Sequence, residues 1–316
     1  MKPKLALLLT LLLLPLALIQ AQFEPPYTTV ALDVSPDGAT LLLSGGVGDC
    51  SGKGGYELRL FNIGQNVINR WLRGFTCGHV GQYSSDGLRI ASAGNGEVIL
   101  WDATTRYKLA RTEIENAVAV SWRVDGSQIA VAANDVVILN TATLQPAITL
   151  DAPGVRALAF SPTDANTLVT LDESNTLKQW SVLTSVGETV AEGVTDMAWS
   201  GDGALIAAII GDEVTVFDAG TGASVEQFAG IGGEDTPLRE VAFSADGRLV
   251  GAVQGANIVT TWDLRTDKEL FTYVDEGMSI NALAVTTLAA GSYRVFYSGD
   301  PLNNDYTEVR WFSVRG

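Results

Sequence analysis

The chain has 316 residues, with 20 Lys and Arg against 36 Asp and Glu, which gives a formal net charge of −16. This acidic balance argues against a nucleic-acid-binding protein, because phosphate binding needs clustered Lys and Arg. The single histidine, His79, excludes a zinc site built on several histidines, and any histidine-dependent catalysis would have to use it.

The first 21 residues have the pattern of a secretory signal peptide. Lys2 and Lys4 precede an apolar run from residue 5 to residue 19, and the small residue Ala21 stands at the place of a cleavage site. An uncleaved membrane anchor is the alternative, but it needs about 20 apolar residues. The sequence predicts a signal peptide over 1–21 and an exported protein over 22–316, secreted, periplasmic or associated with the cell envelope, with no membrane span after cleavage. Loss of Lys2 and Lys4 leaves 18 positive against 36 negative residues, a net charge of −18.

Two short motifs recur along the rest of the chain. The first is a turn in which an aromatic or branched residue is followed by a small polar segment with Asp and usually Gly, and its copies begin at Val34, Tyr83, Trp122, Phe160, Trp199 and Phe243. The second is an apolar strand that ends in an aromatic residue or Leu and then a small polar residue, at Phe61-Asn62, Trp101-Asp102, Leu139-Asn140, Trp180-Ser181, Phe217-Asp218, Trp262-Asp263 and Phe312-Ser313. Successive copies of the second motif are 37 to 50 residues apart. Seven repeats therefore account for nearly the whole mature chain.

Each repeat has signals for four short strands separated by Gly, Asn, Asp and Pro, as in the segments Arg89–Ala93, Val98–Trp101 and Tyr107–Ala110. A single four-stranded sheet has two faces and nothing to bury them against, whereas radial packing of seven sheets buries both. We therefore expect an all-β fold, a seven-bladed β-propeller of four-stranded antiparallel blades. The repeats span approximately 22–63, 64–103, 104–141, 142–182, 183–219, 220–264 and 265–316.

Trp101-Asp102 and Trp262-Asp263 at strand ends, with Ser-x-Asp-Gly turns upstream, resemble the WD-repeat family of β-propellers, in a degenerate form of bacterial type, over residues 27–314. Gly78-His79 lies too close to the following turn to fill the family's Gly-His position, so the family's His–Asp–Ser–Trp network has no complete copy. The resemblance implies a non-catalytic, cofactor-free scaffold that binds a protein partner. Because the last repeat ends on its third strand, ring closure would need residues Gln22–Tyr27 as an outer strand.

The two cysteines of the chain fall in loops that the repeat pattern places on one face. Cys50 lies in the Gly-rich loop of the first repeat, and Cys77 lies in the connection to the second. An exported protein with two cysteines favours a disulfide between them. Two free thiols are the alternative.

The charges are distributed unevenly over the predicted loops. If each unit is counted as strands d, a, b and c, the d–a and b–c loops share one face, and they contain Asp49, Glu113, Glu115, Asp135, Asp151, Asp172, Glu173, Glu192, Asp212, Glu213, Glu234, Asp235, Asp275, Glu276, Asp300 and Asp305, with Lys53 almost alone among basic residues. The opposite face or the outer strands receive Arg89, Arg106, Arg123, Arg248, Arg265 and Lys268. An acidic face would attract a cationic partner or a divalent metal ion. An ordinary solvated surface is the alternative.

Alignment on the aromatic column places one residue of each repeat in register near the start of the inner strand, namely Val30, His79, Val118, Arg156, Thr195, Arg239 and Asn281. A polar cluster of His79, Arg156, Asp196, Arg239 and Glu240 at this mouth is a candidate binding site. Ion pairs between blades are the structural alternative. A second function, an exported hydrolase or lactonase, would have His79, Asp196 and Glu240 as its only candidates for catalysis.

A segment rich in oxygen ligands lies near the C-terminus, where Asp300, Asn304 and Asp305 are a weak candidate Ca²⁺ site. The spacing does not match a helix-flanked calcium loop, and a solvated loop is the alternative. No other cofactor is expected. Neither the identity of the partner nor the oligomeric state follows from the sequence.

Overall fold

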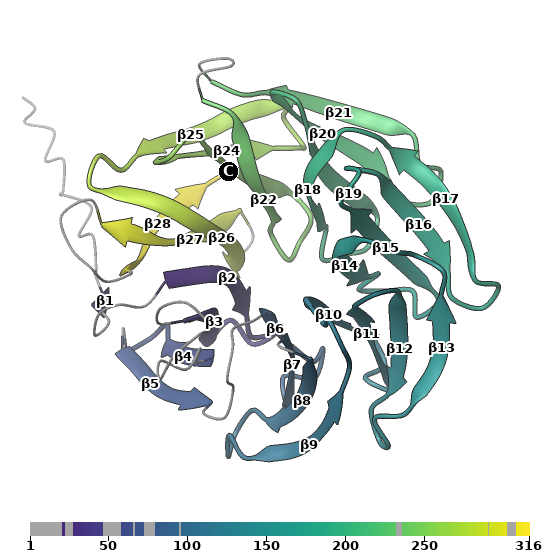
Figure 1. Cartoon of the computed structure of the whole chain (residues 1–316). Coiled ribbons are helices and arrows are strands. Elements are labelled where there is room, and N and C mark those ends of the chain that lie inside the picture. Colours follow the sequence, from purple (N-terminus) through teal and green to yellow (C-terminus); the bar gives the residue numbers. More distant parts are fainter. Residues whose placement is uncertain are drawn as a thin grey trace, which may run out of the picture.

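The structure is a computed structural model of the chain, and it describes residues 21–22, 28–46, 58–65, 67–72, 80–94, 96–231, 236–289, 291–301 and 308–316. In these residues 28 strands form seven four-stranded antiparallel sheets, without any helix. Figure 1 shows the sheets arranged as blades around a central axis. The predicted all-β, seven-bladed propeller is confirmed. Among the same residues, none forms a helix with the length and apolarity that a membrane crossing requires.

Each blade contributes one strand to each of four positions between the axis and the outside (Figure 1). The inner strands of blades 1 to 7 are β2 (Thr28–Val34), β6 (Val80–Tyr83), β10 (Ala119–Trp122), β14 (Val155–Phe160), β18 (Val194–Trp199), β22 (Leu238–Phe243) and β26 (Met278–Ala289). The second strands are β3 (Thr40–Gly46), β7 (Arg89–Gly94), β11 (Gln128–Ala132), β15 (Thr167–Asp172), β19 (Leu205–Ile210), β23 (Leu249–Gln254) and β27 (Ser292–Pro301).

The remaining two positions complete the blades. The third strands are β4 (Leu58–Asn62), β8 (Glu97–Asp102), β12 (Val136–Asn140), β16 (Leu177–Ser181), β20 (Glu213–Asp218), β24 (Ile258–Asp263) and β28 (Glu308–Arg315). The outer strands are β5 (Val67–Leu72), β9 (Lys108–Glu113), β13 (Pro146–Leu150), β17 (Val186–Ala191), β21 (Ser224–Ala229), β25 (Lys268–Val274) and, in blade 7, β1 (Ala21–Gln22).

The ring is closed by the N-terminal end of the described chain. β1 pairs antiparallel with β28, with Ala21 opposite Val309 and Gln22 opposite Glu308. Closure therefore uses Gln22, as predicted, but also Ala21, which the predicted signal boundary would remove. Residues 23–27, the rest of the predicted closing strand, lie outside the described residues.

The repeated aromatic residues of the inner strands pack between neighbouring blades. Trp122 of blade 3 lies in one buried cluster with Val98 and Leu100 of blade 2, and Phe243 of blade 6 packs with Ile209 and other residues of blade 5. Burial of each such ring contributes about 2 kcal/mol. The core is thus a series of joints between neighbouring blades, not one central cluster.

The Asp-containing turns join the inner strand to the second strand of each blade. In four of them a Ser hydroxyl donates to the Asp carboxylate, which also accepts a backbone N–H two residues on, at Ser35/Asp37, Ser84/Asp86, Ser200/Asp202 and Ser244/Asp246. Both hydrogen bonds stabilise the tight turn, so these carboxylates have a structural role. We call the face with turns 35–39, 84–88, 123–127, 161–166, 200–204 and 244–248 the turn face.

Because each blade has four antiparallel strands, the chain leaves every outer strand at the same face on which it enters the next inner strand. We call this second face the mouth face. Among the described residues it includes the connections 114–118, 151–154, 192–193 and 275–277, and the turns 133–135, 173–176, 211–212 and 255–257.

Candidate binding site at the mouth face

The inner strands of five blades carry a β-bulge close to their first residue. The extra residue that disturbs the pairing with the second strand is Val30, Arg156, Thr195, Arg239 or Asn281. In blade 3 the N–H of Val118 donates to the carbonyl oxygen of Ala132 at 2.9 Å, and Ala119 is also paired with Ala132. Val118 and Ala119 therefore both oppose Ala132, as in the bulges of the other five blades.

These positions coincide with the residues that the sequence alignment places in register. A bulge bends its strand and re-aims the side chain. In six of the seven blades the described residues therefore display one such side chain at the same end of the inner strand. We call Val30, Val118, Arg156, Thr195, Arg239 and Asn281 the axial ring. His79, the seventh predicted member, lies outside the described residues.

The axial ring is open to solvent over most of its circumference. Val30 and Val118 are 50 % and 45 % exposed, Arg156, Thr195 and Arg239 are exposed, and Asn281 is half-buried. Two aliphatic side chains exposed beside polar ones give this end of the propeller both apolar contact area and hydrogen-bonding groups.

The two arginines of the ring reach across to the next blade. Nη2 of Arg156 donates to the carbonyl oxygens of Thr195 (2.7 Å) and Val194 (3.3 Å) and to Oδ1 of Asn175 (3.2 Å). Nη2 of Arg239 donates to the carbonyl oxygen of Ile280 at 2.6 Å. Both guanidinium groups therefore stabilise a joint between blades at the mouth face.

Side chains further along the inner strands also bond to the next blade, but here the side chain accepts the hydrogen bond and the next blade donates it. The axis-facing edge of an inner strand has no partner strand, so its N–H groups need other acceptors. The acceptors come from the preceding blade, where Asp33 binds the N–H of Tyr83 (2.7 Å), Gln82 that of Trp122 (2.9 Å), Ser121 that of Phe160 (3.0 Å) and Asp196 that of Val241 (2.8 Å). Together with the two arginines, these bonds hold six of the seven joints.

Two carboxyl groups beside the ring have raised pKa values. Burial raises the pKa of Asp196 to about 6, against the opposing effects of the Val241 and Met197 N–H groups and the Arg156 charge. Burial and then the charge of Asp196 raise the pKa of Glu240 to about 8, with Arg239 opposing them. The Glu240 side chain makes no hydrogen bond to the described residues, and both burial and the Asp196 charge favour its protonated form.

The structure thus brings four of the five predicted site residues to one end of the propeller. In the described residues Arg156, Asp196 and Arg239 all make hydrogen bonds to backbone groups of the next blade, Arg156 also donates to the Asn175 side chain, and no ion pair joins them. Sequence reasoning missed these backbone partners because they belong to another repeat. His79, Cys50 and Cys77 lie outside the described residues, and so does the predicted disulfide.

The predicted Ca²⁺ site falls only partly within the described residues. Oδ2 of Asp300 accepts a hydrogen bond from Nδ2 of Asn281 at 2.9 Å, and Asn304 and Asp305 lie outside. Within the described part of the chain, no three His, Cys, Asp or Glu side chains are grouped in a way that would hold a metal ion.

One acid predicted for the mouth face has a different role. Asp275 is only 4 % exposed and pairs with Nη1 of Arg310 at 2.6 Å, while it also accepts from the hydroxyl of Tyr297 (3.1 Å). Arg310 also binds Glu308 at 2.6 Å. Asp275 is therefore part of a buried ionic cluster that fastens the last connection to blade 7, and it adds no charge to the surface.

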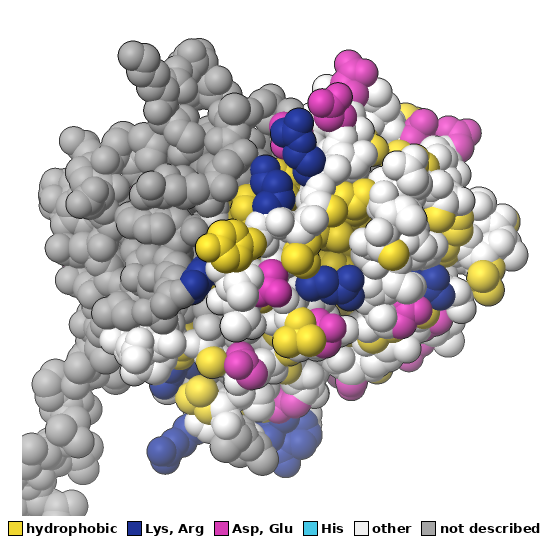
Figure 2. All heavy atoms as spheres, turned by 90° about the horizontal axis from the view of Figure 1, so that it is seen from below, with side chains coloured by type: hydrophobic (Ala, Val, Ile, Leu, Met, Phe, Trp, Pro, Cys, Tyr) yellow, Lys and Arg dark blue, Asp and Glu magenta, His cyan; other side chains and the backbone are white. Residues whose placement is uncertain are grey.

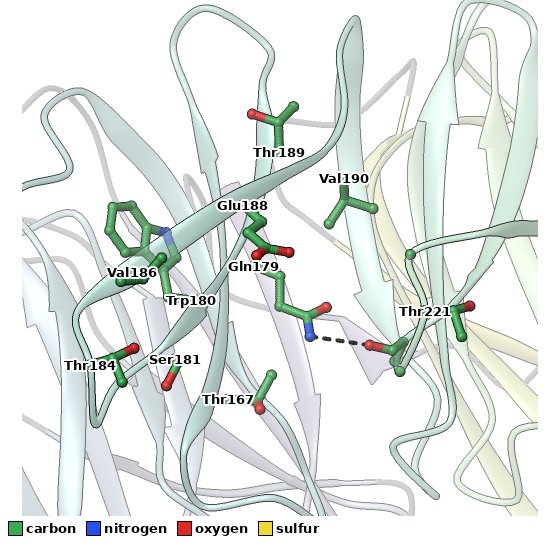
Figure 3. Close-up of a pocket in the computed structure, with 13 residues that line it drawn as sticks. Thr167, Gln179, Trp180, Ser181, Thr184, Val186, Glu188, Thr189, Val190 and Thr221 are labelled. Carbon is green, nitrogen blue, oxygen red and sulfur yellow. Dashed lines mark hydrogen bonds between the residues drawn. The ribbon is translucent and has the colours of Figure 1, made fainter.

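The outer wall of the propeller carries both charged and exposed apolar side chains, among them Leu109, Val186 and Val225 of three outer strands. Figure 2, a view onto one side of the molecule, shows acidic and basic side chains interspersed with small hydrophobic patches. A hollow of about 510 Å³ lies between the outer parts of blades 4 and 5, where the side chain of Gln179 crosses to the carbonyl oxygen of Ala219 (3.1 Å; Figure 3). Its lining consists mainly of hydroxyl, amide and aliphatic groups, with Glu188 as its one charged residue.

Fold and pairing together define the class of protein, a seven-bladed β-propeller with an irregular, bulged ring of residues at one face. No protein-family model matches the chain, and no curated protein matches it. Among solved structures, the crystal structure of the Myceliophteria thermophila Cps50 (Swd1) β-propeller domain is similar, with a TM-score of 0.73, 14 % sequence identity, and 92 % of this chain and 97 % of that chain covered. At this identity the likeness shows a shared propeller fold.

Proposed function

We propose that the protein is an exported, non-catalytic propeller of the WD-repeat type that binds a protein partner through its mouth face. The signal-like residues 1–21 support export, and the Trp-Asp strand ends together with the propeller fold support the WD-repeat assignment. The predicted disulfide between Cys50 and Cys77 belongs to the same proposal, since exported proteins form such bonds in an oxidising compartment.

The observation that carries the binding role is the axial ring. Repeated bulges expose non-identical side chains at equivalent places, among them the aliphatic Val30 and Val118. Neighbouring polar side chains such as Asp196 and Arg156 are used to hold blades together. This combination suits a rigid surface that recognises another protein, because interfaces need preorganised apolar anchors more than reactive groups.

The proposal is tested by co-purification of the full-length protein from the cells that make it. The double variant Val30→Arg, Val118→Arg places two charges in the ring, and Leu183→Arg places one at a 75 % exposed site in a turn on the turn face. We expect the partner to co-purify with the wild type and with Leu183→Arg. With the double variant, recovery of the partner should fall about tenfold. Equal recovery with all three proteins would refute binding at the mouth face.

The alternative, an exported hydrolase or lactonase, is favoured by one observation. Glu240 has a raised pKa near neutrality next to Asp196, an arrangement from which general acid–base pairs are made. A screen with esters and lactones tests this alternative, followed by Glu240→Gln in any case of turnover. Turnover that is lost in a folded Glu240→Gln variant would establish the enzyme, and unchanged turnover would exclude this site.

A further inference from the structure

The joint between blades 2 and 3 contains a guanidinium group on the turn face. Arg89, the first residue of β7, donates from Nη2 to the carbonyl oxygen of Gly126 at 3.0 Å. Its guanidinium carbon lies 4.7 Å from the centroid of the Trp122 ring, which is the geometry of a cation–π contact. The hydroxyl of Thr141 donates to the same Gly126 oxygen at 2.9 Å. An aromatic wall, a carbonyl acceptor and a threonine therefore form a socket that the arginine of the preceding blade fills.

The joint between blades 1 and 2 has the same socket without the arginine. Counting from the Ser of each turn, Thr40 of blade 1 takes the position of Arg89. In blade 2, Tyr83, Gly87 and Ala103 take the positions of Trp122, Gly126 and Thr141. All four line a single pocket of about 300 Å³, which we call the joint pocket.

Both donors that occupy the Gly126 oxygen are missing from the joint pocket. Thr40 has no guanidinium group to stand in for that of Arg89, and Ala103 has no hydroxyl. Among the described residues no donor binds the carbonyl oxygen of Gly87. The hydroxyl of Tyr83 interacts with Thr40, and both residues line the pocket.

The remaining lining suits a long cationic side chain. Asp37 and Asp86 both border the joint pocket, and hydrogen bonds from Ser35 and Ser84 hold the pKa of each carboxyl below its usual value. Leu88, which is 61 % exposed, lies at the rim with Pro36. An arginine could pack its aliphatic stem on this apolar rim and place its charged end inside.

We propose that the joint pocket binds the guanidinium group of an arginine side chain on a protein partner. The arginine would stack on Tyr83, donate to the carbonyl oxygen of Gly87 and meet the carboxylates of Asp37 and Asp86, as Arg89 stacks and donates within the chain at the next joint. A planar, forked donor fits these acceptors, whereas a lysine ammonium is a point charge without a stacking face. The pocket lies on the turn face, so this inference is independent of binding at the mouth face.

The test uses an acetylated, amidated five-residue peptide with one central arginine, and two versions with citrulline or lysine in its place. Binding to the full-length protein is followed by ligand-observed NMR. We expect the arginine peptide to bind, the citrulline peptide to lose about tenfold in affinity because the charge is gone, and the lysine peptide to be weaker than arginine. Absence of arginine binding, or equal binding of arginine with either other peptide, would overturn the proposal.

A self-filling variant locates the binding. Thr40→Arg supplies from blade 1 the side chain that blade 2 already has, so the arginine peptide should bind about tenfold more weakly. Leu183→Arg adds the same charge at an exposed site on the turn face and should leave the affinity unchanged. A folded Thr40→Arg protein that binds like the wild type would overturn the assignment.

Two further measurements do not depend on the folding of that variant. Asp86→Asn keeps an oxygen for the turn but removes a charge, and it should weaken arginine binding severalfold. A photoreactive version of the arginine peptide should crosslink the wild type within residues 35–40 and 83–88. Crosslinks confined to the mouth face, or loss of binding in the Val30→Arg, Val118→Arg variant, would place the arginine elsewhere and contradict the joint pocket.

Discussion

Asp33 links blades 1 and 2, and the free energy needed to bury its carboxyl group depends on pH. Its Oδ2 accepts the N–H of Tyr83 at 2.7 Å, and burial raises the pKa of the carboxyl from 3.8 to about 7, against the effects of this bond and of the Val34 N–H. The folded protein therefore holds the proton more tightly than the unfolded chain does. Stability contributed by the neutral form is complete below pH 3.8 and is lost as the pH rises toward about 7.

Asp33→Asn removes this penalty and retains a carbonyl oxygen for the Tyr83 N–H. A pKa difference of about three units corresponds to about 4 kcal/mol at most. Because the side chain is half-buried, solvent screening reduces the expected gain at pH 8 to about 2 kcal/mol. Near pH 4 the variant and the wild type should be equally stable, since Asp33 is then protonated in the native state.

Urea unfolding followed by tryptophan fluorescence between pH 4 and pH 8 measures the difference. Gln82, which makes the same bond to Trp122 in the next joint at 2.9 Å, provides the reciprocal control. Gln82→Glu introduces an ionisable carboxyl at this joint, so the variant should lose stability as the pH rises. Wild-type Gln82 has no ionisable group and gives no such pH dependence. An Asp33→Asn protein less stable than the wild type at pH 8, or a difference that is constant over the pH range, would refute the reasoning.

Two further outcomes follow from the packing of the blades, and a third follows from the sequence. Arg310→Met should lower the free energy of unfolding by about 4 kcal/mol in urea titrations, because the buried carboxylates of Asp275 and Glu308 lose their counter-charge; a loss below about 1 kcal/mol would contradict a buried cluster. Gly201→Ala should cost about 2 kcal/mol, since its Cβ would lie 2.2 Å from a carbonyl oxygen of the next blade. Gly64→Ala is the matched control, because its added Cβ would lie 3.6 Å from the nearest atom, Oδ1 of Asn62. Thermal melts of both variants measure the difference, and Gly64→Ala should be nearly neutral. Intact mass should rise by two hydrogens when the native protein is reduced, and alkylation of both cysteines without reduction would exclude the predicted disulfide.

Turn chemistry and aromatic spacing made the blade architecture predictable from the sequence. The predicted strand over residues 89–93 lies within β7, which ends at Gly94, and the predicted strand over 98–101 lies within β8, which spans Glu97–Asp102. Both strands are bordered by turn residues. The two-residue β1 could not be recognised in this way, because a strand so short has no periodicity and forms only when the ring closes.

The candidate site was predictable in position but not in bonding. Arg156 and Arg239 were placed in register correctly, yet the carbonyl oxygens that they bind lie about 40 residues away and come together only through packing of the next blade. A bulge also interrupts the alternation on which strand interpretation relies. Asp275 was predicted at the surface for the same reason, because its partner Arg310 lies 35 residues further along the chain.

The most direct test of the proposed function is crosslinking with mass spectrometry on the wild-type protein in the cells or medium in which it occurs. A lysine- and carboxylate-reactive reagent should join the partner to residues of the mouth face, such as Asp151, Glu192 and Asp212, which belong to its connections and turns. Crosslinks to one reproducible protein at these positions are the result that the proposal predicts. Reproducible crosslinks confined to the outer strands, with none to the mouth face, would contradict it.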